Sequence, residues 1–286
     1  MTTAWETLGR VPLERLADAR LQLHWAAQAA SAVGKQLLDH QPDSSEQSFV
    51  WRDGPRALVQ GAVPGPLPFR SGLRPARPAL VLLDEGDRSI REHLLDSHTL
   101  EEAYAWLEGQ IREHLGRRLE RPLERPGEEI PPHPVASGAR FSAADGEAFE
   151  EMGRWFFNAH HFLSAVAARN PGASPVRCWP HHFDIATRIA LDPEGDAETA
   201  RSINIGLSPG DAARAEPYFY ATPWPYPQGK PFPELDGGGF WNTEGWTGAV
   251  LPASDLVRSP RGEEQREQAE RFVATAIAAC RNLLGA

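Results

Sequence analysis

The spacing of apolar residues predicts a long helix over residues 12–38. Its leucines and alanines recur at intervals of three, four or seven residues, so they fall on one stripe of an α-helix while polar residues fill the rest. The stripe consists of Leu13, Leu16, Leu23, Ala27 and Ala30. A helix with one apolar stripe packs that stripe against another layer of the protein.

Starting signals and apolar spacing predict three further helices. One begins at Thr99, where two glutamates lie in the first turn and interact favourably with the helix dipole. Another begins near Ser142, where the pattern Ser-x-x-Asp resembles a capping box. The last covers the closing segment 262–284.

Short segments of β character lie between these helices. Those of the first half are 48–51, 57–63, 79–84 and 88–95, and those of the second half are 177–191, 201–208, 216–224 and 246–252. Gly, Pro and Asp separate the segments, as is typical of antiparallel hairpins. The pattern therefore predicts an α+β protein with two tandem helix–antiparallel sheet–helix modules.

The modules are expected at residues 1–118 and 142–286. The proline-rich stretch 119–141 has no apolar period and is predicted to be a linker or an extended crossover. The stripe of the first helix matches that of the second-half helix at one constant offset, which places His24 on His160. Two interpretations fit this match, an ancient duplication and a chance agreement of short stripes.

The second predicted sheet has one apolar face and one polar face. If 177–191 is a single strand, His182, Asp184 and Arg188 lie on the face opposite Phe183 and Ile185. Neighbouring strands add further residues to the polar face: Asn204, Glu216, Tyr218, Tyr220, Glu244 and Trp246. Aromatic side chains with polar tips suit a ligand cleft, although a second core beneath the first half would also bury them.

Adjacent histidines followed by an aspartate suggest a metal site or acid–base chemistry. On one strand the Cα atoms of His182 and Asp184 are about 6.6 Å apart, so both side chains could bind one divalent ion, catalytic zinc or non-haem iron. Glu216, Glu244 or His160 could supply a third ligand. His181 is a further candidate ligand, but on a strand it points to the opposite face, where such a histidine is more often structural.

Two other interpretations of this strand do not need a metal. His182 and Asp184 could form an acid–base pair, in which the carboxylate raises the pKa of the imidazole. Alternatively, Arg188 could pair with Asp184 in an ordinary polar face. The loop 223–241 is expected to act as a lid over this face, because long loops are usually functional or disordered and its aromatic content argues against disorder.

Composition narrows the class of partner. The net charge of −10 argues against nucleic acid, which is bound through lysine and arginine. No apolar run is long enough to span a membrane, and the first residues lack the apolar core of a signal peptide, so a soluble cytoplasmic protein is expected. A small molecule is therefore the expected partner, and the sequence does not indicate an oligomeric state.

Several short motifs of the second half resemble a bacterial family built on a domain of unknown function. They are "WPHHFD" (179–184), "SPGD" (208–211), "EPYFY" (216–220) and "TEGWTGAVLP" (243–252). The resemblance implies no activity, but it implies one constellation of important residues: His181, His182, Asp184, Glu216, Tyr218, Tyr220, Glu244 and Trp246.

These observations predict an enzyme, metal-dependent and either a hydrolase or an oxidoreductase, that acts on a small polar or aromatic molecule. His182 and Asp184 would hold the metal or form the acid–base pair, with Glu244 or Glu216 as a further ligand or base. The expected substrate-binding residues are Tyr218, Tyr220, Trp246, Arg188 and Asn204. The alternative is a small-molecule-binding protein without catalysis that uses the same cleft. A scaffold that assembles through its aromatic face is a third interpretation.

Overall fold

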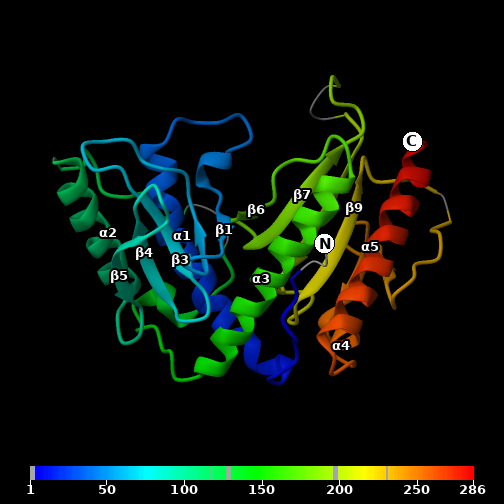
Figure 1. Ribbon diagram of the computed structural model, residues 1–286, viewed down its shortest axis with the longest axis horizontal. Coiled ribbons are helices and arrows are strands. Elements are labelled where there is room, and N and C mark those ends of the chain that lie inside the picture. The colour runs from blue at the N-terminus through cyan, green and yellow to red at the C-terminus, as the bar shows by residue number, and fades with distance from the viewer. Residues whose placement is uncertain (1–3, 117, 127–129, 196–198, 230) are drawn as a thin grey trace. The chain divides into compact units, whose positions relative to one another are not determined.

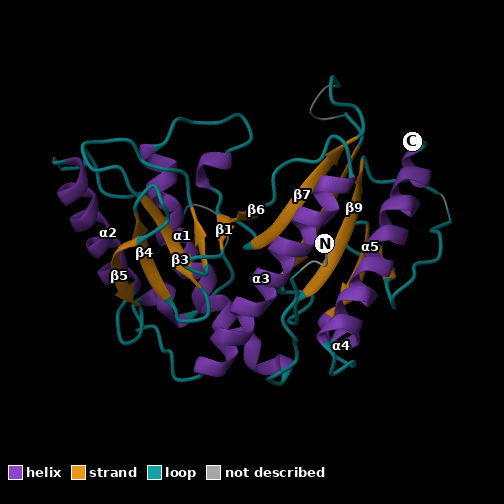
Figure 2. Ribbon diagram, viewed as in Figure 1, coloured by secondary structure: helices purple, strands orange, loops and turns teal. Residues whose placement is uncertain are grey.

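The computed structural model describes residues 4–116, 118–126, 130–195, 199–229 and 231–286. It is an α+β protein with two antiparallel sheets, as the sequence pattern predicts (Figure 2). Its contacts divide the chain into two compact units. The first unit comprises Arg15–Gly153 and Arg177–Phe183, and the second comprises Met1–Glu14, Arg154–Val176 and Asp184–Ala286. These boundaries differ from those expected at residues 118 and 142.

The first unit contains a five-stranded sheet in which each strand pairs with the next along the chain. Its strands are β1 (Val50–Arg52), β2 (Ala57–Val59), β3 (Arg70–Arg74), β4 (Ala79–Leu83) and β5 (Ser89–Leu94). Every residue of β4 is buried. The sequence pattern did not predict β3, because the segment "RSGLR" lacks alternation of apolar and polar residues.

Two long helices complete this unit. Helix α1 (Leu16–Leu37), which follows the short helix η1 (Leu13–Arg15), packs on β3 and contacts helix α2 (Leu100–Leu115) (Figure 1). The predicted stripe is buried at Leu16, Leu23, Ala27 and Ala30, whereas Leu13 is half-buried.

Helix α2 begins as the sequence predicts, with a capping box at Thr99. The Glu102 backbone N–H donates to the Thr99 hydroxyl at 3.2 Å, and the Thr99 N–H donates to the Glu102 carboxylate at 2.7 Å. Helix α3 (Gly146–Arg169) begins four residues later than predicted. Its cap is Asp145, whose carboxylate accepts from the Ala148 N–H, whereas the Ser142 hydroxyl accepts from Ala144 in the turn before.

The proline-rich stretch, where the structure describes it, is an extended crossover packed within the first unit rather than a free linker. The guanidinium of Arg125 lies 3.7 Å from the centre of the Tyr104 ring and donates to the Glu101 carboxylate. Further along, the Trp25 indole donates to the carbonyl of Pro131 at 3.0 Å, and Pro134–Ser137 forms the short helix η3. These contacts hold the stretch against α1 and α2.

The second unit contains five antiparallel strands in the order β10-β11-β9-β8-β7. They are β7 (Asp184–Ala190), β8 (Ser202–Ser208), β9 (Tyr218–Trp224), β10 (Phe240–Asn242) and β11 (Gly248–Pro252). Helix α5 (Gly262–Leu284) lies along β9 (Figure 1). The Phe162 ring of α3 meets the Phe219 ring of β9 edge-on at 5.4 Å. One face of this sheet is therefore covered by helices of its own unit.

The predicted strand 177–191 is interrupted. Strand β6 (Arg177–Trp179) ends before a turn over residues 180–183, and the next strand begins at Asp184. Phe183 has the left-handed φ of 56° and its N–H donates to the carbonyl of Trp179, which closes the turn. The side-chain alternation expected across His182 and Asp184 therefore does not apply, because only Asp184 belongs to the strand.

The buried residue His24 holds this turn against α1. Its Nε2 atom lies 2.9 Å from the carbonyl oxygen of Pro180, and its ring stacks on the Phe183 ring at 5.4 Å. A neutral imidazole that carries its proton on Nε2 can donate this hydrogen bond.

None of the helices described in the structure is both long and apolar enough to cross a lipid bilayer.

We predict that His24 makes the protein less stable in mild acid. Burial lowers its pKa from 6.5 to about 4, against the opposing effect of the hydrogen bond to Pro180. As the pH falls from 6.5 to 4, the unfolded chain binds a proton at this site that the folded chain does not bind. The free energy of unfolding should therefore fall over this range, by up to about 3 kcal/mol.

Urea unfolding at a series of pH values measures this dependence. The variant His24→Gln keeps an amide donor near the Pro180 carbonyl but does not titrate, so its stability should change less between pH 6.5 and 4. An equally steep loss in this variant would assign the dependence to other groups.

Candidate functional site

Several of the predicted site residues meet on the face of the second unit's sheet opposite Phe219. The Tyr220 hydroxyl donates to the Asp184 carboxylate, although the two residues lie on strands separated by β8. Gly206 of β8 leaves room for this contact, because a Cβ atom at this position would lie only 2.6 Å from the Tyr220 ring. The tyrosine ring therefore lies across the glycine and reaches the next strand.

Tyr218 and Trp246 extend the same cluster. The Tyr218 hydroxyl donates to Asp211, which also accepts the backbone N–H groups of Ala213 and Arg214 at 2.8 and 2.7 Å. Burial, followed by this hydrogen bond, raises the pKa of Tyr218, so its phenol stays protonated. The rings of Tyr218 and Trp246 are stacked with centres 6.4 Å apart. The prediction that Asp184, Tyr218, Tyr220 and Trp246 share one face is thus confirmed.

The two histidines of the motif do not belong to a strand. Both are exposed in the turn 180–183, which belongs to the first unit, and their rings are 4.4 Å apart. The predicted placement of His182 beside Asp184 along one strand is wrong, because the left-handed residue Phe183 ends the extended chain before Asp184.

Two of the predicted acidic residues lie apart from the cluster. Glu216 accepts the backbone N–H and the hydroxyl of Ser254 at 2.6 and 3.0 Å, and so caps the short helix α4 (Ala253–Leu256). Glu244 is exposed in the turn between β10 and β11. Its backbone carbonyl accepts from the side chain of Asn242.

The remaining candidates lie on β7, β8 and α3 of the second unit. Arg188 is exposed and Asn204 is half-buried, and the two are paired across β7 and β8 on the face that carries Asp184. His160 lies on α3 with its ring 5.3 Å from that of His161. Among the residues that the structure describes, no group of three or more His, Cys, Asp and Glu side chains could hold a metal ion.

The expected lid over the polar face is not seen in the part of the loop that the structure describes after residue 230. The Asp236 N–H donates to the Thr275 hydroxyl at 3.1 Å, and the Gln268 amide donates to the Gly237 carbonyl at 2.8 Å. Both partners belong to α5, which covers the opposite face of the sheet. This part of the loop is therefore tied to the helical layer.

A cavity of about 350 Å³ lies within the first unit, at a place that the sequence reasoning missed. Polar side chains of α1 form one wall, a loop before β1 forms another, and the first part of the proline-rich crossover and the turn after β6 complete it. Its lining includes Gln28, Ala32, Lys35, Asp43, Glu124 and Trp179. His181 also lines it, so one motif histidine does face a cavity.

A pattern in the sequence could have identified the residues of α1 that line the cavity. Gln28, Ala32 and Lys35 recur at intervals of four and three residues, and therefore share one face of the helix beside the apolar stripe. Lysine is rare in this chain, since Lys35 and Lys230 are its two examples. The lining residues of the loop and of the crossover could not be recognised from the sequence, because they are far from the α1 residues along the chain.

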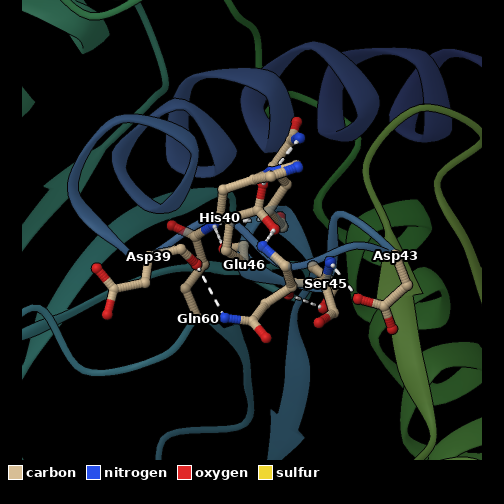
Figure 3. A network of polar contacts seen from close by, with 9 residues as sticks. Asp39, His40, Asp43, Ser45, Glu46 and Gln60 are labelled. Carbon is tan, nitrogen blue, oxygen red and sulfur yellow. Dashed lines mark hydrogen bonds and ion pairs between the residues drawn. The ribbon is translucent and has the colours of Figure 1, made fainter.

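A buried polar network holds the loop of this cavity against α1 (Figure 3). The Gln60 side chain accepts the N–H of Gly34 at 3.0 Å, and its amide nitrogen lies 3.1 Å from the carbonyl of Gln47 in the short helix η2 (Ser45–Gln47). A Cβ atom at Gly34 would lie 2.2 Å from the Glu46 carbonyl oxygen, so only glycine permits this close approach.

Glu46 is the buried anion of this network. Burial raises the pKa of its carboxyl, but hydrogen bonds from the Gln41 backbone at 3.1 Å and from His40 at 3.2 Å oppose burial, and the net pKa is lowered. The carboxylate is therefore ionised at neutral pH and fixes the chain on both sides of Asp43 (Figure 3). The loop that lines the cavity is therefore held by hydrogen bonds within the protein.

Comparisons with known proteins give no assignment. No family model, curated protein or solved structure matches the chain. The resemblance to a bacterial family of unknown function stays a prediction, and any functional argument depends on the chemistry of the residues themselves.

We predict that Gly206→Ala destabilises the second unit. The new methyl group would lie 2.6 Å from the Tyr220 ring and 2.8 Å from the Ile185 carbonyl oxygen, so the ring or the strand must move. Overpacking of this kind lowers the free energy of unfolding by about 1–3 kcal/mol. Gly109→Ala on α2 is the matched control, because nothing lies within 4 Å of its added Cβ and alanine favours a helix. Equal stability of the two variants would contradict the close contact.

We also predict that Gln60→Leu destabilises the first unit by about 2–5 kcal/mol. It would remove the hydrogen bonds that the Gln60 side-chain oxygen accepts from the Gly34 N–H and the Ser71 hydroxyl, and the one that its amide donates to the Gln47 carbonyl. Gln41→Leu, at an exposed position of the same loop, should change stability by less than about 0.5 kcal/mol, since only its backbone reaches Glu46. Urea denaturation measures both, and similar losses would argue against the central role of Gln60.

Proposed function

We propose that this protein binds a small polar molecule in the cavity of the first unit. One observation carries the proposal: a volume of about 350 Å³ is lined by charged and hydrogen-bonding side chains together with a tryptophan. Ligand pockets are typically about 300–1,000 Å³ in size and combine apolar rings with a few placed polar groups.

The surroundings of the cavity favour binding because hydrogen bonds hold the loop and the turn that form its walls. Gln60 and Glu46 hold the loop, and Gln28 donates to the carbonyl of Pro180 at 2.6 Å, which fixes the turn that carries His181. A pocket that is ordered before its ligand arrives does not lose the conformational entropy that a flexible pocket loses on binding. The binding function was the alternative in the sequence analysis, although it was expected on the other unit.

The enzyme interpretation rests on a different observation, the carboxylate of Asp184 held by the Tyr220 hydroxyl. A carboxylate fixed in this way could exchange a proton with a bound molecule. That a zinc or iron ion takes part stays a prediction, which elemental analysis of protein purified without a histidine tag can check.

If the ligand binds in the cavity, a side chain that fills the cavity should abolish the stabilisation of the protein by the ligand. Ala32 is buried and lines the cavity, so Ala32→Phe should occupy part of it. A thermal-shift screen with individual amino acids, nucleosides, sugars, carboxylic acids and phosphate esters should find a class that raises the Tm of the wild-type protein. A ligand present at 100 times its Kd stabilises a protein by about 2.7 kcal/mol.

The Ala32→Phe variant should lose this shift. The matched control is Ala105→Phe, at an exposed position of α2, which should keep it. The proposal is rejected if no compound stabilises the wild type, or if Ala32→Phe responds as the wild type does.

A further inference from the structure

The cavity is lined by cationic and anionic side chains. These side chains differ in how many of their hydrogen-bonding groups are already engaged within the protein. Arg125 lines it, but its guanidinium is already engaged by the Glu101 carboxylate at 2.5 Å, the Leu123 carbonyl at 2.9 Å and the Tyr104 ring. The Nζ atom of Lys35 lies 3.3 Å from a carboxylate oxygen of Glu124. Because an ammonium carries three donors, Lys35 can donate to a ligand as well.

The acidic residues of the lining complement Lys35. Hydrogen bonds from Ser45 lower the pKa of Asp43, so this exposed residue is ionised at neutral pH. Glu124 is half-exposed beside Lys35. A simple anion would meet two carboxylates here, and a simple cation would meet the lysine, so either would face a like charge.

We infer that the ligand is a zwitterion, an α-amino acid with an aromatic side chain, and this inference rests on the proposed function of the cavity. In an α-amino acid one carbon separates the ammonium from the carboxylate. The adjacent opposite charges of Lys35 and Glu124, 3.3 Å apart, match this arrangement. The ligand carboxylate binds Lys35, and its ammonium binds Glu124 and Asp43.

The residues at the Gln28 end of the cavity, opposite to Lys35, indicate what kind of side chain the ligand carries. Gln28 lies seven residues before Lys35 on the same face of α1, which is about 10 Å along the helix axis. The Gln28 amide donates to Pro180 at this end, beside the half-buried ring of Trp179 and the ring of His181, 6.3 Å apart. A planar side chain would pack on Trp179, and a hydroxyl at its tip would donate to the Gln28 amide oxygen.

Isothermal titration of the full-length protein with three related compounds tests this inference. L-Tyrosine has both charged groups, tyramine lacks the carboxylate, and 3-(4-hydroxyphenyl)propionate lacks the amine. We expect tyrosine to bind about tenfold or more tightly than either analogue, since each analogue leaves a charged group of the cavity without its counterpart.

Variants of Lys35 assign the charge contact. Lys35→Met should weaken tyrosine binding about tenfold, whereas Lys35→Arg should retain most of the affinity for tyrosine. Lys35→Met should not weaken tyramine binding, because tyramine has no carboxylate and its ammonium faces the like charge of the lysine. Lys35 is 40% exposed at the end of α1, so these substitutions should not prevent folding, and circular dichroism checks this. The inference is overturned if either analogue binds as tightly as tyrosine, or if Lys35→Met has no effect.

The screen described above separates failure of this inference from failure of the proposed function. If a compound of another class stabilises the protein and Ala32→Phe abolishes the effect, the cavity is a binding site and the zwitterion assignment is wrong. If Ala32→Phe does not reduce the stabilisation by any compound, tyrosine included, both the zwitterion assignment and the proposed binding function are wrong.

Discussion

A buried amide determines how closely helix α1 can approach the rest of the first unit. Gln60 accepts the N–H of Gly34 in the last turn of the helix and places its own amide nitrogen against the carbonyls of Ser31 and Gln47. The Ser31 hydroxyl adds a second hydrogen bond to the Gln47 carbonyl at 3.1 Å, so the helix and the loop are joined at more than one point. The absence of a side chain at Gly34 allows the contact, and the hydrogen bonds make it specific. The position of the cavity wall follows from this packing, because Gln47 belongs to the loop that lines the cavity.

Glycine has a related role in the sheet of the second unit. Gly206 and Gly248 leave room on the strand surface, which the rings of Tyr220 and Trp246 occupy. The aromatic rings therefore lie along the sheet instead of standing away from it, and the tyrosine hydroxyl reaches a carboxylate on the next strand but one. This packing explains why the tyrosines and a tryptophan gather on one face without forming part of the helix-covered core.

Alternation along a strand located part of the candidate site. It correctly grouped Asp184, Tyr218, Tyr220 and Trp246, since these belong to regular strands or to the turn beside one. It failed at His182, because Phe183 adopts a left-handed conformation that no local rule anticipates for a phenylalanine. The ring of Phe183 is buried against His24, a residue more than 150 positions away, and this contact stabilises the unusual backbone.

The sequence by itself determined the class of the fold, the long helices and most of the strands. These features depend on short-range periodicity and on capping groups within three or four residues, which a single chain segment contains in full. Tertiary structure decided where the polar cavity lies and which residues line it. Gln28 and Lys35 come from one helix, but Asp43, Glu124 and Trp179 come from segments far apart in the chain. Their meeting depends on the packing of α1 against a buried amide, and no local pattern records that contact.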